Sequence, residues 1–162
     1  MLDKRKFYIN GKWVSPSKPN DLDVINPSTE EAFATISLGS KEDTNAAVSA
    51  AKKALVTWSE SSKEERVKLL EKLLDIYKKR YSEMTEAISM EMGAPMDWSN
   101  DAQTSSGQSH LEDFIVRLKE FKFDEQFSPE SNNRICYEPI GVCGLITPWN
   151  WPINQIALKV VP

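Results

Sequence analysis

The stretch GVCGLITPWNWP, residues 141–152, decides how the rest of this chain is interpreted. An apolar run from Ile140 to Ile146, of the kind that fills a buried strand, changes abruptly into two prolines, two tryptophans and one asparagine. Chains usually leave a buried strand through Gly, Asn, Asp or Ser. The run predicts a buried strand, and Asn150 followed by Pro152 predicts the cap and first turn of a helix.

Two roles compete for Asn150 at this junction. Open α/β sheets bind ligands where a parallel strand leads into a helix. The Asn150 side chain either caps the helix while the tryptophans only pack, or its amide NH₂ points into a cleft and donates a hydrogen bond to a developing oxyanion. The residues alone leave both roles open.

The composition excludes several classes of protein. A chain of 162 residues can bury a core, and 40% apolar and 27% charged residues are typical of a soluble globular protein. A net charge of -4 without a basic patch argues against a nucleic-acid partner. No apolar stretch resembles a membrane span or a signal peptide, so we expect a cytoplasmic protein.

The cysteines and the single histidine do not form a recognisable catalytic or metal site. Cys136 and Cys143 are too few for a disulfide scaffold and lack zinc-site spacing. Cys143 lies in the apolar run, where burial would raise the pKa of its thiol, and we expect both cysteines to be structural. His110 has no Ser or Cys at a triad-like spacing, so we expect it to lie on the helix surface or to pack. No metal site and no G-x-G-x-x-G loop is predicted.

The first third of the chain predicts β structure followed by helices. Asn10-Gly11 within FYINGKWV predicts a hairpin with a type I′ turn. Two short strands are expected on either side of Asn26-Pro27-Ser28.

Three helices are expected next. Capping boxes begin at Ser40 and Ser62 and open the first two. The second helix carries an apolar stripe through Val67–Ile88 and ends at Gly93. A third helix is expected over about Asp97–Phe121, and RICYEPIG then predicts a return to strand.

These blocks together resemble one family. EPIGVCGLITPWNWPINQIALKVVP resembles the Pro-Trp-Asn region of the NAD(P)-dependent aldehyde dehydrogenases, and YINGKWV, INPSTEE, KEERVKLLEKLLDIY and EMGAP fit the same family in the expected order. The resemblance extends from Phe7 to Pro162. It implies an α/β fold, the N-terminal part of the aldehyde dehydrogenase fold: a Rossmann-type NAD-binding domain with an N-terminal β-hairpin and helices, plus an oligomerisation hairpin.

The resemblance also implies a division of the chain. Residues 1–122 would be the hairpin and helices of the NAD-binding domain, residues 123–138 the oligomerisation hairpin, and residues 139–162 the first strand–helix unit of the NAD-binding sheet. The catalytic domain would be absent. A homodimer or homotetramer is implied for the intact protein, and some members hold a monovalent cation near the segment that matches Val24-Ile25.

The resemblance implies roles for individual residues of this chain. Asn150 matches the asparagine that holds the oxyanion together with a backbone amide. Lys159 matches a lysine with a proton-relay role in parts of the family, and its alternative is an ordinary surface lysine. The segment that lines the NAD pocket matches Ile146, Thr147, Pro148 and Trp149, followed by Asn150.

The implied function is oxidation of an aldehyde to a carboxylic acid with NAD⁺ or NADP⁺. A cysteine thiolate would form a thiohemiacetal and then a thioester, and a glutamate would activate water. Both residues would lie beyond Pro162, so residues 1–162 alone should show no activity. Two alternatives stay open: a truncated, inactive interaction module, and a helical binding domain with a chance likeness at Pro-Trp-Asn.

Overall fold

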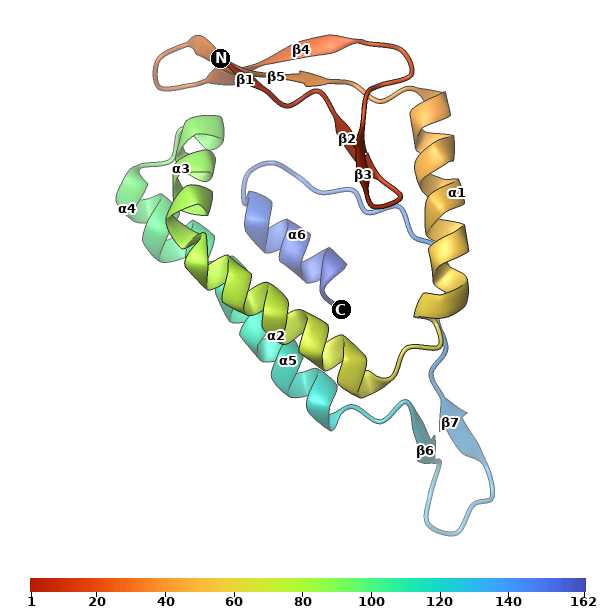
Figure 1. Ribbon diagram of the computed structural model, residues 1–162. Coiled ribbons are helices and arrows are strands. Elements are labelled where there is room, and N and C mark those ends of the chain that lie inside the picture. Colours follow the sequence, from red (N-terminus) through yellow and green to blue (C-terminus); the bar gives the residue numbers. More distant parts are fainter.

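The computed structural model describes residues 1–162 and begins with two small sheets. Strands β1 (Leu2–Asp3), β5 (Glu31–Ser37) and β4 (Asp21–Asn26) form a three-stranded sheet in that spatial order. Strand β1 is parallel to β5, and β4 is antiparallel to it. Strands β2 (Phe7–Ile9) and β3 (Lys12–Val14) form a separate hairpin (Figure 1).

The predicted turn between β2 and β3 is confirmed. Asn10 has φ 53° and Gly11 has φ 73°, which is the positive-φ pair that a type I′ turn requires. The strands expected around Asn26-Pro27-Ser28 are confirmed as β4 and β5.

Both predicted capping boxes are present. Helix α1 (Lys41–Trp58) begins after Ser40, whose side chain accepts from the Asp43 amide while the Asp43 carboxylate accepts from the Ser40 amide. Helix α2 (Lys63–Lys79) begins with the same reciprocal pair, Ser62 and Glu65. Each pair satisfies two amides that the first helical turn leaves without partners.

The prediction of one helix through Val67–Ile88 is wrong. Helix α2 ends at Lys79, and α3 (Tyr81–Met92) begins after Arg80, which has φ -108° and ψ 19°. This bend lets α2 pack against α5 while α3 turns toward β4 (Figure 1). A single non-helical residue does not interrupt the apolar periodicity, so the sequence pattern does not reveal the break between the two helices. Helix α3 ends at Gly93 with φ 71°, as predicted.

The third predicted helix is present but contains an unpredicted π-helical turn. It consists of α4 (Met96–Trp98), the π turn η1 (Ser99–Thr104) and α5 (Ser105–Glu120). The polar η1 turn is buried against α3: the Thr104 and Thr85 hydroxyls lie 3.0 Å apart. Tyr77 of α2 donates to the Thr104 carbonyl at 2.8 Å. Such turns are rare and occur frequently at functional sites.

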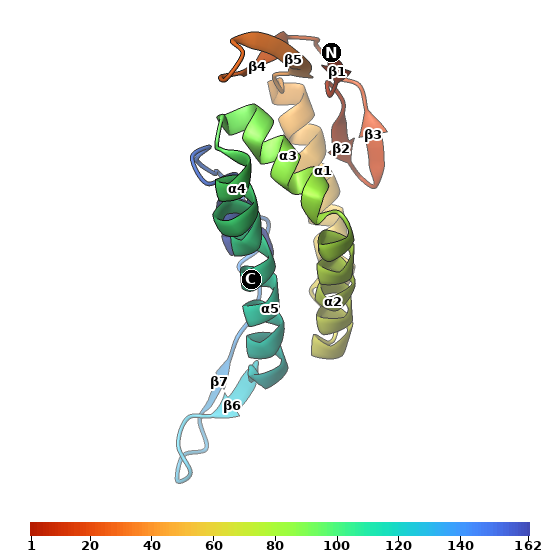
Figure 2. The same cartoon turned by 90° about the vertical axis from the view of Figure 1, so that its left-hand side faces the viewer.

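The helices α2, α3 and α5 enclose the small apolar core. Its larger buried side chains come from these three helices, namely Val67, Ile88, Leu111 and Ile115. Helices α2 and α5 run side by side (Figure 2). None of the helices is both long and apolar enough to cross a membrane.

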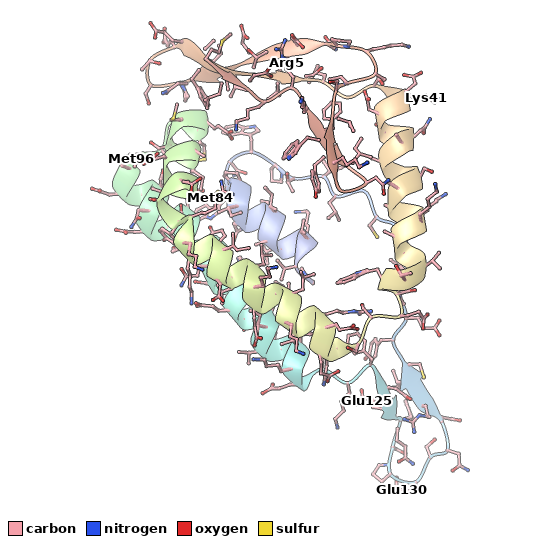
Figure 3. All side chains as sticks on the ribbon, in the orientation of Figure 1. Arg5, Lys41, Met84, Met96, Glu125 and Glu130 are labelled. Carbon is pink, nitrogen blue, oxygen red and sulfur yellow. The ribbon has the colours of Figure 1, made fainter.

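A second hairpin projects away from the helices. Strands β6 (Asp124–Gln126) and β7 (Arg134–Cys136) are antiparallel, and an ion pair of 2.7 Å joins Arg134 to Asp124. Glu130 marks the outer end of this hairpin, far from the helical layer (Figure 3).

The strand predicted for Ile140–Ile146 is wrong. No strand forms there, and Ile140 and Ile146 are 95% and 89% exposed. A strand requires a hydrogen-bonding neighbour, and each of the sheets present pairs other segments of the chain. The chain instead continues without regular structure until helix α6 (Pro152–Val160).

Candidate cofactor and oxyanion site

The five residues expected to meet the cofactor lie together in one exposed loop before α6. Trp149 is 80% exposed and Ile146 89%. Thr147, which carries a hydroxyl, and Pro148 come between them in sequence, and both are exposed. The loop thus presents an apolar surface with hydroxyl and amide groups beside it.

Asn150 does not cap α6, contrary to one of its two expected roles. The N-cap is Trp151, with φ -148° and ψ 67°, and the helix has no side-chain cap. Pro152 occupies the first helical turn, as predicted, because that position needs no amide donor. The helix begins one residue later than expected, so the exposed Asn150 amide makes no hydrogen bond within the chain. Its NH₂ group is therefore free to bind something else.

Lys159 lies in the last turn of α6. Its Nζ donates to Gln155 Oε1 at 2.9 Å, four residues earlier on the same helix. The side chain is half-buried, and its backbone lies about 10 Å along the helix axis from Pro152. The structure therefore places Lys159 near the end of the helix that follows the candidate loop, and its hydrogen bond goes to Gln155 and not to Asn150.

Helix α6 is fixed to α5 at its first turn. Trp151 Nε1 donates to Ser106 Oγ at 3.0 Å, and His110 Nε2 lies 2.6 Å from Asn154 Oδ1. His110 was expected to pack or to lie on its helix surface, and it is half-buried with this specific partner. Sequence patterns gave no indication of the pairing, because 44 residues separate the two side chains.

The expectation of a buried Cys143 is wrong. Its side chain is exposed because the strand that would bury it does not form. Cys136, on β7, is also exposed, and its thiol donates to Asp124 Oδ1 at 3.5 Å. Desolvation raises the pKa of Cys136, and the hydrogen bond to the Asp124 carboxylate raises it further. A raised pKa favours the protonated thiol, which is a weaker nucleophile than the thiolate.

No cluster of three or more His, Cys, Asp or Glu side chains is arranged to hold a metal ion. Val24 and Ile25 lie on β4 where its pairing with β5 shifts register.

This chain resembles known proteins over almost all of its length. The family model described as the aldehyde dehydrogenase family matches residues 13–162. A 3-succinoylsemialdehyde-pyridine dehydrogenase from a Pseudomonas species is 43% identical over 100% of this chain and 34% of its own length.

Two solved structures show the same fold. The crystal structure of an aldehyde dehydrogenase from Bartonella henselae is 56% identical with a TM-score of 0.97, over 99% of this chain and 34% of that one. Aldehyde dehydrogenase C from Pseudomonas syringae, a mutant in complex with NAD⁺ and octanal, is 39% identical with a TM-score of 0.92, over 97% of this chain and 32% of that one. The chain spans about a third of the length of these relatives. The likeness at Pro-Trp-Asn is therefore not a chance one: the chain belongs to the aldehyde dehydrogenase family, and its α/β fold is the N-terminal part of that family's fold.

Proposed function

We propose that residues 1–162 act as the N-terminal segment of an NAD(P)-dependent aldehyde dehydrogenase, which oxidises an aldehyde to a carboxylic acid. The observation that carries this proposal is the free Asn150 amide, which follows the exposed loop 146–149 and precedes α6. A structural neighbour that binds NAD⁺ and an aldehyde, octanal, supports the choice of cofactor and substrate class.

The loop before Asn150 fits a nicotinamide nucleotide. Ile146 and Trp149 offer apolar surface to the flat nicotinamide ring, with Pro148 between them. The Thr147 hydroxyl is suited to a ribose hydroxyl or the carboxamide. When bound, NAD⁺ or NADP⁺ accepts the hydride that leaves the aldehyde carbon. The residues of this chain would hold and orient the ring and exclude water from its reacting face.

Asn150 would stabilise the charge that develops during the reaction. When a cysteine thiolate attacks the aldehyde carbon, an S–C bond forms and the carbonyl π electrons move to oxygen. The Asn150 NH₂ then donates a hydrogen bond to that oxyanion. Expulsion of hydride leaves a thioester, and water attacks it to release the acid and restore the thiolate.

We use the term family-length protein for a chain as long as the relatives, of which residues 1–162 span about a third. The nucleophile and the general base are proposed to lie in its part outside residues 1–162. Cys136 is not suited to the role because its pKa is raised. Lys159 is proposed to relay a proton near the cofactor, for which it would have to leave Gln155.

The remaining parts of the segment receive structural roles. Residues 1–122 are proposed to support the NAD-binding domain, and residues 123–138, the projecting hairpin, to join subunits of a homodimer or homotetramer (Figure 2). Residues 139–162 have no strand partner within this segment, and they are proposed to join the NAD-binding sheet, followed by α6, only beside strands outside residues 1–162. A cytoplasmic location is part of this proposal.

Two measurements test the proposal. The intact mass of the natural protein should greatly exceed 18.4 kDa, the mass of residues 1–162. The protein should then form NADH or NADPH only when both aldehyde and oxidised cofactor are present. If the natural protein has a mass of 18.4 kDa and forms no reduced cofactor, it would instead be an inactive interaction module.

A further inference from the structure

The first turn of α6 meets α5 through side chains that repeat with helical spacing. Ser106 and His110 are four residues apart on α5, so they lie on one face of that helix. Trp151 and Asn154 are three residues apart at the start of α6 and face them. Two separate hydrogen bonds therefore fix both the position and the rotation of α6.

The first bond belongs to a short chain. Trp151 Nε1 donates to Ser106 Oγ at 3.0 Å, and Ser106 Oγ donates to the Gln103 carbonyl at 2.7 Å. An indole N–H can only donate and a carbonyl can only accept, so Ser106 both accepts and donates. The Trp151 ring also packs edge-on against Trp98, at 5.9 Å between centroids and 76° between planes. The residue next to Asn150 is thereby tied to η1 and α4.

The second bond joins His110 to Asn154. Nε2 and Oδ1 are 2.6 Å apart, and the amide oxygen can only accept, so the imidazole donates. Both side chains are half-buried, which shields the bond partly from competing water.

A glycine between these two bonds sets the distance between the helices. A Cβ at Gly107 would lie 2.7 Å from Ile153 Cγ1, which is closer than atoms pack. The helices are therefore already in the closest contact that a residue without a side chain allows. We call this arrangement the α5–α6 contact: Ser106, Gly107 and His110 with Trp151, Ile153 and Asn154.

We infer that Ser106 and His110 are positioning residues for Asn150. The inference rests on the proposed function. Asn150 is exposed and has no hydrogen bond of its own, so its position is set through the backbone by Trp151, the next residue. The α5–α6 contact holds Trp151 and the first turn behind it. Ser106 and His110 therefore act through Asn150, without touching substrate or cofactor.

The test uses the family-length protein and a double-mutant cycle. Ser106→Ala and His110→Ala should each lower kcat by about 10-fold with little change in KM, because a displaced oxyanion donor weakens binding mainly of the transition state. His110→Gln keeps an N–H donor and should retain kcat within about 3-fold. Ser109→Ala, on the exposed side of α5 and without a side-chain bond, is the matched control and should not change kcat.

The same variants are then made in the Asn150→Ala background, with folded concentration checked by circular dichroism. Because the positioning residues act through the Asn150 amide, Ser106→Ala and His110→Ala should cost less than about 2-fold there. An equal loss of kcat in both backgrounds, or no loss in either, would refute the inference. If His110→Ala does not fold, the inference is tested by the kcat of Ser106→Ala in the two backgrounds and by the retained kcat of His110→Gln. A wild-type protein without aldehyde-dependent reduction of NAD⁺ or NADP⁺ would refute the proposed function instead.

Discussion

Replacing Gly107 with alanine tests the closest approach in the helical layer. A Cβ there would lie 2.6 Å from the Tyr77 hydroxyl oxygen and 2.7 Å from Ile153 Cγ1. These atoms belong to α2 and α6, two helices that both pack against α5. Tyr77 cannot turn away without losing its 2.8 Å hydrogen bond to the Thr104 carbonyl. The added methyl group must therefore displace a helix or break that bond.

The free energy of unfolding should fall by about 1–3 kcal/mol. Overpacking of this kind costs about 1–3 kcal/mol, and loss of the Tyr77–Thr104 hydrogen bond costs about 1 kcal/mol more. The higher helix propensity of alanine stabilises the fold by about 1 kcal/mol, which offsets the loss of the hydrogen bond. The expected fall in the free energy of unfolding is therefore the steric cost alone.

Urea denaturation of the purified protein measures this difference. Ser109→Ala gains helix propensity at an exposed site on the same helix, so it should be neutral or slightly stabilising. Tyr77→Phe removes the nearest clashing atom, so the loss from Gly107→Ala should be smaller in that background. A Gly107→Ala protein as stable as the wild type would show that α2, α5 and α6 are not in the tight contact described above.

Two further predictions concern the N-terminal part of the chain. The amides of Ser40 and Ser17 donate to the Asp43 carboxylate, which lowers the pKa of Asp43 to about 2 from 3.8. A lowered folded-state pKa stabilises the fold above pH 3.8, and this stability is lost as the pH falls toward 2. Asp43→Asn should therefore reduce the pH dependence of stability in that window, and an unchanged acid titration by circular dichroism would contradict the assignment. Gly11→Ala should cost about 1–2 kcal/mol because Gly11 has φ 73°, although no atom lies within 4 Å of the added methyl group. Gly144→Ala is equally open but lacks positive φ, so denaturation should show almost no change, and equal losses at both sites would contradict this account.

Local signals predicted the elements that depend on local chemistry. The Asn10-Gly11 turn needs only two residues that accept positive φ, and the capping box at Ser40 needs only a partner three residues later. Both were therefore predictable. The bend at Arg80 was not, because the tertiary packing of α2 on α5 and of α3 on β4 requires it, while the apolar stripe continues through it.

The candidate site was predictable only in part. The composition of residues 146–150 and the family resemblance predict the cofactor and oxyanion residues in this loop, and their roles stay predictions. The same composition favoured a strand over Ile140–Ile146, but a strand depends on a partner that local sequence does not reveal. The bond between His110 and Asn154 was also missed, since it depends on how α5 and α6 meet in space.

The steady-state kinetics of Asn150→Ala in the family-length protein test the central claim most directly. Removal of an oxyanion donor should lower kcat for aldehyde oxidation by about 10²–10³-fold, with a much smaller change in KM. Asn45→Ala, an exposed asparagine on α1 without a side-chain bond, is the matched control and should keep wild-type kcat. A wild-type kcat for Asn150→Ala would contradict the assignment of this amide to the oxyanion.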